Sequence, residues 1–352
     1  MTQPQPTAEA EVLRLETRLA SLERAALLND VRNELANADA SLLRLPQEIA
    51  ALRGRGFFYR ANWEARLQAL ADEWPRLRSE ALGVIESQSA ALRLDILRAE
   101  EAVRHLSPLR NSPLSAAEPT LRRVEGEIVT CELRVRAAEE AARNRFKAVT
   151  SSLEALAREV ADCSRMMGWL AEARFALQPG EGLVEAVKAR LLKGDERQEG
   201  ILFLTDQRLI FERREKVARK KVLFITTASE TIQEVVWEAS LAQIGEVKAA
   251  EARRALVMKR ELLTIAPAPD GHFGPAELEL EADSEAWRAL ILRCQTGEIA
   301  QDRVGGAPEV PVFIIPPKCP SCGATLERAG PVRGVASIRC EYCGTTIPLQ
   351  RA

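Results

Sequence analysis

The chain has 352 residues and a mass of 38.9 kDa, which is enough for two or three domains with cores of their own. Charged residues make up 28% of the chain and apolar residues 46%, a balance that excludes a disordered polymer and an integral membrane protein. The formal net charge is -2 and there are only 2 histidines, which disfavours a globally basic nucleic-acid binder and histidine-based acid–base catalysis.

The first region, residues 1–177, is rich in alanine, leucine, arginine and glutamate, the composition of long helices. After Pro119, apolar residues recur in alternating steps of three and four from Leu121 to Ala142, and again from Phe146 to Leu170. This spacing predicts a heptad seam on one long helix, and Cys131 and Cys163 fall on it as small apolar core residues. A similar stripe runs from residue 12 to residue 45.

Breakers divide this region into three predicted helices. Gly54 and Gly56 end the first, Pro108 and Pro113 end the second, and Pro75 is expected to kink the second. The third helix, at roughly residues 115–176, is too long to be covered by a compact domain. Its seam needs partner helices: either the first two helices folded back as an antiparallel hairpin, or a second copy of the chain. We therefore expect a long helical hairpin or coiled coil, with self-association through the helices as one alternative.

The second region, residues 178–297, changes to the two-residue period of strands. Short β-rich runs lie at 185–192, 199–205, 207–213, 221–227, 232–238, 244–249, 260–266 and 277–282. A helix follows at 284–294, with Asp283 or Ser284 as its N-cap. Many consecutive strands that end in one amphipathic helix predict a small antiparallel barrel or sandwich capped by that helix.

One hairpin in this region carries a family resemblance. The run from Gly200 to Phe211, GILFLTDQRLIF, follows a strand and a Pro-Gly-Glu segment at 179–181. Thr205 and Asp206 are turn formers between two apolar strands, and Arg208 is expected to pair with an acid near the turn. The run resembles the opening hairpin of GRAM and bacterial PH-like domains. That resemblance covers about 120 residues and implies seven strands with a C-terminal helix; PH-like folds bind lipids, peptides or their own copies.

The C-terminal region, residues 318–352, contains a metal-binding pattern. Cys319 and Cys322 form one Cys-x-x-Cys pair, Cys340 and Cys343 form another, and 17 residues separate the pairs. This spacing matches the tetrahedral Zn²⁺ site of a zinc ribbon, which the segment resembles over about 32 residues. Because four cysteines fill the coordination shell, we expect one structural zinc ion per chain and no open position for catalysis. An odd cysteine count with such pairs also fits a reducing compartment better than a disulfide framework.

The ribbon is also mildly basic, with five basic residues against two acidic residues from 317 to 352, a weak nucleic-acid footprint. Between the β region and the ribbon, residues 298–317 have the composition of a linker. The middle of this linker, residues 310–315, is apolar and extended, and is expected either to dock as an added strand on a neighbouring domain or to cover the ribbon.

The densest basic run lies between two apolar segments and is interpreted as a hairpin tip. It either contacts an anionic surface or forms a solvated turn. Its residues are Arg213, Arg214, Lys216, Arg219, Lys220 and Lys221.

Together these patterns predict a multidomain α plus β protein: a helical region, a PH/GRAM-like β domain, a linker and a zinc ribbon. None of the P-loop, dinucleotide-binding, HExxH or GxSxG motifs is present in the sequence, so we expect a protein that is not an enzyme. The leading hypothesis is a scaffold or adaptor that binds a protein partner, an anionic membrane surface, or both. The alternative is a nucleic-acid-binding regulatory protein that uses the ribbon. With no leader or membrane-spanning segment recognised, the expected location is the cytoplasm, with peripheral contact at the inner face of the membrane.

Overall fold

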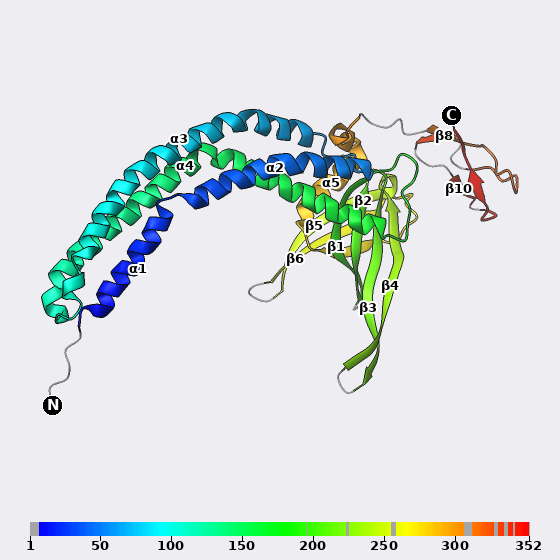
Figure 1. Ribbon diagram of the computed structural model, residues 1–352. Helices are drawn as coiled ribbons and strands as arrows, with labels where there is room; N and C mark the ends of the chain where they lie inside the picture. Colours follow the sequence, from blue (N-terminus) through cyan, green and yellow to red (C-terminus); the bar gives the residue numbers. More distant parts are fainter. Residues whose placement is uncertain are drawn as a thin grey trace. The chain divides into compact units, whose positions relative to one another are not determined.

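The computed structural model describes residues 7–194, 196–222, 225–254, 258–305, 312–326, 330–333, 337–340 and 342–351 (Figure 1). The chain divides into two compact units. The helical unit comprises Met1–Ile49 and Trp63–Val160, and the β unit comprises Ala50–Asn62 and Ala161–Ala352. Among the described residues, no helix has the length and apolar content needed to span a bilayer.

Four long helices supply the helical unit: α1 (Glu9–Ala25), α2 (Asn29–Gly54), α3 (Trp63–Arg104) and α4 (Leu114–Ala171). Ion pairs join them. Arg18 of α1 pairs with Glu132 of α4 at 2.9 Å, and Arg143 of α4 pairs with Glu34 of α2 at 2.9 Å. Trp74 of α3 donates to an Asp39 carboxylate oxygen on α2 at 2.6 Å. The first helices therefore fold back along α3 and α4 within one chain.

The predicted seam of α4 is buried throughout the helical unit. Every seam residue from Leu121 to Val160 is buried, and Leu156 is completely inaccessible. The exposed face of α4 instead carries charged residues that form pairs one turn apart, such as Arg123 with Glu127. This burial confirms that the heptad period marks the core face and shows that the chain's own helices cover it.

Two helix details differ from the sequence prediction. The first predicted helix is two helices, because Leu28 adopts a positive φ of 52° between α1 and α2 and leaves the helical conformation. Pro75 lies inside α3, which continues on both sides of it, so the second predicted helix is a single element. Helix α4 ends at Ala171 rather than near 176, because the Arg214 guanidinium donates to the Trp169 carbonyl at 2.6 Å and takes up one of the last helix acceptors.

The β unit is built on a seven-stranded antiparallel sheet in the order β4-β3-β2-β1-β7-β6-β5. The strands are β1 (Leu183–Lys193), β2 (Glu196–Thr205), β3 (Arg208–Val222), β4 (Ile225–Ser240), β5 (Ile244–Arg254), β6 (Met258–Pro267) and β7 (Ala276–Leu280). Helix α5 (Ser284–Thr296) follows and buries Trp287, Ile291 and Cys294. Asp283 caps α5 by accepting from the Ala286 amide at 2.8 Å. The strand number and the single closing helix are those that the PH-like resemblance implies.

The sequence predicts eight strand runs and the structure has seven strands. The predicted run 221–227 is not a strand of its own, because it spans the end of β3 and the start of β4. The runs 221–227 and 232–238 both belong to one long hairpin, in which β3 pairs with β4 from Arg208 opposite Ser240 to Val222 opposite Ile225. The apolar run 221–227 predicts a separate strand, but Val222 instead pairs with Ile225 within this hairpin, which Figure 1 shows extending past the other strands of the sheet.

The turn between β2 and β3 is fixed as predicted. The Thr205 hydroxyl accepts from the Arg208 amide at 2.9 Å and donates to Glu181 at 2.6 Å. Arg208 then pairs with Glu181 at 2.8 Å and with Glu238 at 2.7 Å, and only 10% of its side chain is exposed. Thr205 and Arg208, at the two ends of this turn, therefore belong to one buried network of polar side chains with Glu181.

The C-terminal region forms two small sheets. Strands β8 (Val312–Ile315), β9 (Gly330–Arg333) and β12 (Gln350–Arg351) make one sheet in the order β12-β8-β9, and β10 (Ser337–Arg339) pairs with β11 (Thr346–Pro348). Strand β8 lies in the range expected to be a linker. It pairs with β9 and β12 of the C-terminal region. Of the two expectations for this apolar segment, the structure therefore agrees with the one in which it covers the ribbon.

Candidate metal centre

Two backbone turns with the same hydrogen bonds present the four cysteines. In the first turn the Gly323 amide donates to the Cys319 carbonyl at 2.9 Å, and the Cys319 amide donates to the Ala324 carbonyl at 2.8 Å. The second turn repeats this pattern, with Gly344 and Cys340 at 2.9 Å and Cys340 and Thr345 at 2.9 Å. Gly323 and Gly344 have φ values of 73° and 72°, a left-handed conformation that glycine adopts without a steric cost.

These turns bring the four sulfur atoms together. All four Sγ atoms lie within 4.8 Å of one another. The Cys319 and Cys343 sulfurs are 3.8 Å apart, as are those of Cys322 and Cys340. A disulfide would require about 2.05 Å. A tetrahedron of sulfurs at about 2.3 Å from a Zn²⁺ ion has edges of about 3.8 Å, so these separations match a tetrathiolate zinc site.

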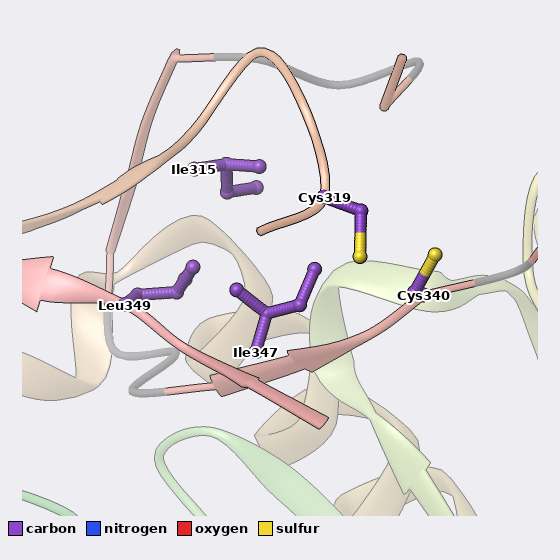
Figure 2. Packing of buried hydrophobic residues seen from close by; sticks show 5 residues of the cluster. All are labelled: Ile315, Cys319, Cys340, Ile347 and Leu349. Carbon is purple, nitrogen blue, oxygen red and sulfur yellow. The ribbon is translucent and has the colours of Figure 1, made fainter. Parts of the chain in front are cut away.

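The two turns differ in their surroundings. Cys319 and Cys340 are buried, whereas Cys322 and Cys343 are exposed. The buried pair belongs to a small apolar cluster with Ile315, Ile347 and Leu349. Figure 2 shows the sulfurs of Cys319 and Cys340 close together beside these side chains. One side of the cysteine cluster therefore rests on the ribbon core and the other side faces solvent.

The thiol pKa values show that the four neighbouring sulfurs do not ionise together easily. Hydrogen bonding to the Thr345 side chain and amide lowers the pKa of Cys343 to about 6. The Ala324 amide lowers the pKa of Cys322, but contact with the Cys343 sulfur, burial and the other two sulfurs outweigh it and raise that pKa to about 12. Neighbouring sulfurs cannot all be thiolates without a compensating charge. A divalent cation bound at their centre would supply that charge.

The donor set limits the choice of metal. Four thiolates in a tetrahedron suit Zn²⁺ or iron, and a closed shell of four protein ligands is the form of a structural zinc site. No other group with suitable ligand geometry is found among the described residues. Cys131, Cys163 and Cys294 are buried, and burial raises the pKa of Cys163 and of Cys294 to about 12 each, which makes them inert.

Residues that the sequence analysis did not single out support the cysteines. Thr345 Oγ1 lies 3.4 Å from the Cys343 sulfur, and Ile347 pairs with Ile338 across β10 and β11. Leu349 and Ile315 complete the apolar cluster. A hydroxyl two residues after the last cysteine, followed by alternating apolar residues, is the sequence signal that would have indicated them.

The basic run of the β unit lies along strand β3, not at a turn. Arg213 pairs with Glu215 at 2.7 Å, and Arg214 pairs with Glu212, a completely buried carboxylate. These two arginines are therefore held inside the β unit. The side chains of Lys216, Arg219, Lys220 and Lys221 lie outside the described part of the chain, so an anionic-surface contact by this run depends on them alone.

Comparisons with known proteins leave the family open. No protein-family model and no curated protein matches the sequence. A DH/PH fragment of PDZ-RhoGEF, solved in complex with GTP-gamma-S activated RhoA, is 12% identical with a TM-score of 0.27, over 84% of this chain and 96% of that chain. A Vav1 exchange factor structure is 11% identical with a TM-score of 0.24, over 93% and 96%. The C-terminal domain of an unknown protein from Leishmania infantum is 14% identical with a TM-score of 0.21, over 33% and 86%. No inference about function follows from similarities at this level.

Proposed function

We propose that this protein is a non-enzymatic adaptor whose C-terminal ribbon is held by one structural Zn²⁺ ion, and whose helical and PH-like parts bind a protein partner and an anionic membrane surface. The sulfur separations of 3.8 Å carry the zinc assignment. Four cysteine ligands leave the metal no open position for water or substrate. The ion acts on folding and not on a reaction.

The ribbon core is small enough to need the metal. Among the residues that the structure describes here, the buried cluster has five members, of which two are the ligands Cys319 and Cys340. Apolar burial on this scale does not offset the conformational entropy of ordering the segment. Binding of zinc supplies the difference, because metal binding to a site absent from the unfolded chain is folding free energy.

The protein partner is assigned to the helical unit. Leu94 and Leu97 lie one turn apart on α3 and are 59% and 53% exposed, and Leu133 on α4 is 59% exposed. Arg134 of α4 pairs with Asp95 of α3 at 2.6 Å, so these leucines lie at the same level of the bundle. Leu94 and Leu97, three positions apart, are neighbours on the surface of α3, and adjacent exposed leucines outside a filled core are typical of a surface that a partner covers.

An affinity capture from the native cell tests the adaptor. The double variant Leu94→Asp/Leu97→Asp should lose a partner that the wild-type chain captures. A matched control, Ser79→Asp/Ser87→Asp, adds the same charge at exposed polar positions of α3 and should keep that partner. Detection of a specific catalytic turnover abolished by one substitution, or equal capture by both variants, would contradict the proposal.

The alternative is a nucleic-acid-binding regulatory protein. Tyr342, between the two ligands of the second turn, is 66% exposed in a mildly basic ribbon, a position from which an aromatic ring can stack on a base. A salt-titrated gel-shift assay tests this reading, because phosphate contacts make affinity fall steeply with salt. Absence of any shift at low salt would eliminate it.

A further inference from the structure

Strand β5 forms one edge of the seven-stranded sheet and, among the described residues, pairs with β6 alone. The strand registers show which of its backbone groups face away from β6. The Glu281 amide donates to the Lys188 carbonyl at 3.0 Å, so the backbone groups of Lys188 on β1 face β7. Successive residues direct their amide and carbonyl groups to opposite sides of a strand. Carried through the registers of β1, β7, β6 and β5, this alternation turns the backbone groups of Val247 and Ala249 away from β6.

Helix α5 contacts this open edge and agrees with that direction. Arg288 Nε donates to the Val247 carbonyl at 3.1 Å, and Gln295 Nε2 donates to the Ile244 carbonyl at 2.9 Å. Two side chains of α5 therefore take carbonyl groups that a neighbouring strand would otherwise use. Farther along β5, the amide and the carbonyl of Ala249 have no hydrogen-bond partner among the described residues. The edge therefore offers a backbone donor and a backbone acceptor.

The same helix places an apolar side chain beside the edge. Leu292 lies four residues after Arg288 and three residues before Gln295, so the three side chains share one face of α5. The core face of the helix is buried, but Leu292 is 40% exposed. A large apolar side chain thus lies next to the unpaired backbone of β5 and is not covered by the β unit.

We propose that β5 accepts an extended segment of a partner protein as an added strand, with a large apolar side chain of that segment packed on Leu292. An extended backbone presents amide and carbonyl groups with the period of the open edge, and its alternate side chains face α5. This inference rests on the binding of a protein partner in the proposed function. It names the strand that binds the partner and the form of the bound segment.

Other occupants of the edge fit less well. Residues 248–252 of β5 are alanines and charged residues, so a second copy of β5 would bring no large apolar side chain to Leu292. The apolar segment Val312–Ile315 of the same chain is already paired with β9 and β12. Charge does not select the occupant, because Lys248 beside the edge is paired with Glu246 at 2.9 Å. Backbone pairing and one apolar contact are what the edge offers.

Hydrogen exchange of the free chain tests the edge itself. The Ala249 amide should exchange faster than the amides of Lys248 and Ala250, which face β6. A library of random short peptides displayed on phage and selected on the full chain supplies a probe. A synthetic copy of a selected peptide should slow the exchange of the Val247 and Ala249 amides. Protection of Ala249 in the free chain, or a selection that yields no binding peptide, would overturn the inference.

Titration of the labelled peptide by fluorescence polarisation compares variants of the two contacts. Ala249→Pro removes a donor that faces away from β6 and should weaken binding about tenfold or more, because a ring also stands where the added backbone must approach. Its control, Ala249→Ser, keeps the amide and should stay within about twofold of the wild type. Leu292→Asp should weaken binding about tenfold or more, whereas Ala289→Asp, at an exposed position of the same helix, should not.

Circular dichroism establishes that each variant is folded before binding is compared. If every selected peptide binds Ala249→Pro and Leu292→Asp as tightly as the wild type, the edge inference fails. The adaptor function still stands if Leu94→Asp/Leu97→Asp loses a captured partner. If affinity capture finds no partner but the two edge variants lose the peptide, the adaptor proposal fails and the edge inference stands. A dimer in light scattering that Ala249→Pro abolishes would assign the edge to a second copy and overturn the inference.

Discussion

The buried Arg208–Glu181 pair allows a quantitative test of how the β unit is stabilised. Arg208 donates through Nε and one amino group to both oxygens of Glu181, at 2.8 and 3.0 Å, and also to the Ala176 carbonyl at 2.7 Å. The Glu181 side chain has no exposed surface. In Arg208→Met this carboxylate stays buried and, among the described residues, keeps the Thr205 hydroxyl and the Gln178 amide as its hydrogen-bond donors. Breaking a buried pair from one side costs about 3–5 kcal/mol.

The control is an exposed pair in the same sheet. Lys248 and Glu246 on β5 are 2.9 Å apart with 66% and 56% of their side chains exposed. Lys248→Met should therefore cost about 0–1 kcal/mol. Native-state hydrogen exchange of the β2 and β3 amides measures both losses, and in Arg208→Met protection should fall by about a hundredfold or more. Equal protection in the two variants would refute the view that burial makes the Arg208 pair important.

Other predictions concern the helical unit and the ribbon. Leu153→Asp should destabilise the helical unit by several kcal/mol, because Leu153 is only 2% exposed and the new charge would be buried without a partner. Ser152→Asp, at the exposed neighbouring position, should not. Hydrogen exchange of the α4 amides compares the two variants. Because the chain's own helices fill the seam, light scattering should give a monomeric mass over a wide concentration range, and a concentration-dependent dimer would contradict this. Cys340→Ser should unfold residues 318–348 together with β8 and β12, which belong to the same small sheets and core, and should leave the exchange of helices α1–α5 and strands β1–β7 unchanged. Zinc binding at pH 7 must displace the proton of Cys322, because the pKa of this thiol is raised to about 12. Acidification should therefore reprotonate the thiols and release zinc. Full retention of zinc at about pH 4 would argue against thiolate ligands.

Local patterns predicted the parts of the fold that local physics decides. The seam of α4 follows from its period, because a helix must bury the residues that share one face. The cysteine cluster follows from two short turns that each hold their own ligands, and the residues between them only have to return the chain. The turn at Thr205 and the pairing of Arg208 followed from residue types within a few positions.

Features that depend on distant segments were not readable from the sequence. The break at Leu28 leaves the apolar stripe almost continuous, and only a positive φ distinguishes it. The sequence indicates an exposed cation at Arg214, but its guanidinium donates to the buried Glu212 carboxylate and to the Trp169 carbonyl at the end of α4. Segment 50–62 packs with the region after α5, where the Val304 amide donates to the Phe58 carbonyl at 2.7 Å. That contact joins residues far apart in the chain and has no local signal.

The apolar end of the β3–β4 hairpin misled the strand prediction for a related reason. Apolar β-branched residues near Val222 have strand propensity, and the sequence between the two halves lacks the glycine or asparagine that usually marks a hairpin turn. A propensity argument therefore assigns a separate central strand where the structure has the end of β3 and the start of β4. Only the pairing of Val222 with Ile225 distinguishes the two.

The central claim is that four cysteines hold one structural zinc ion, and X-ray absorption at the zinc edge together with elemental analysis of the purified chain tests it most directly. We predict about one zinc per chain and four sulfur neighbours at about 2.3 Å. The Ser variant of Cys131, Cys163 and Cys294 together should have the same occupancy and spectrum, because these thiols are buried away from the ribbon core. Oxygen or nitrogen in the zinc shell, loss of zinc from that triple variant, or full occupancy in Cys340→Ser would contradict the assignment.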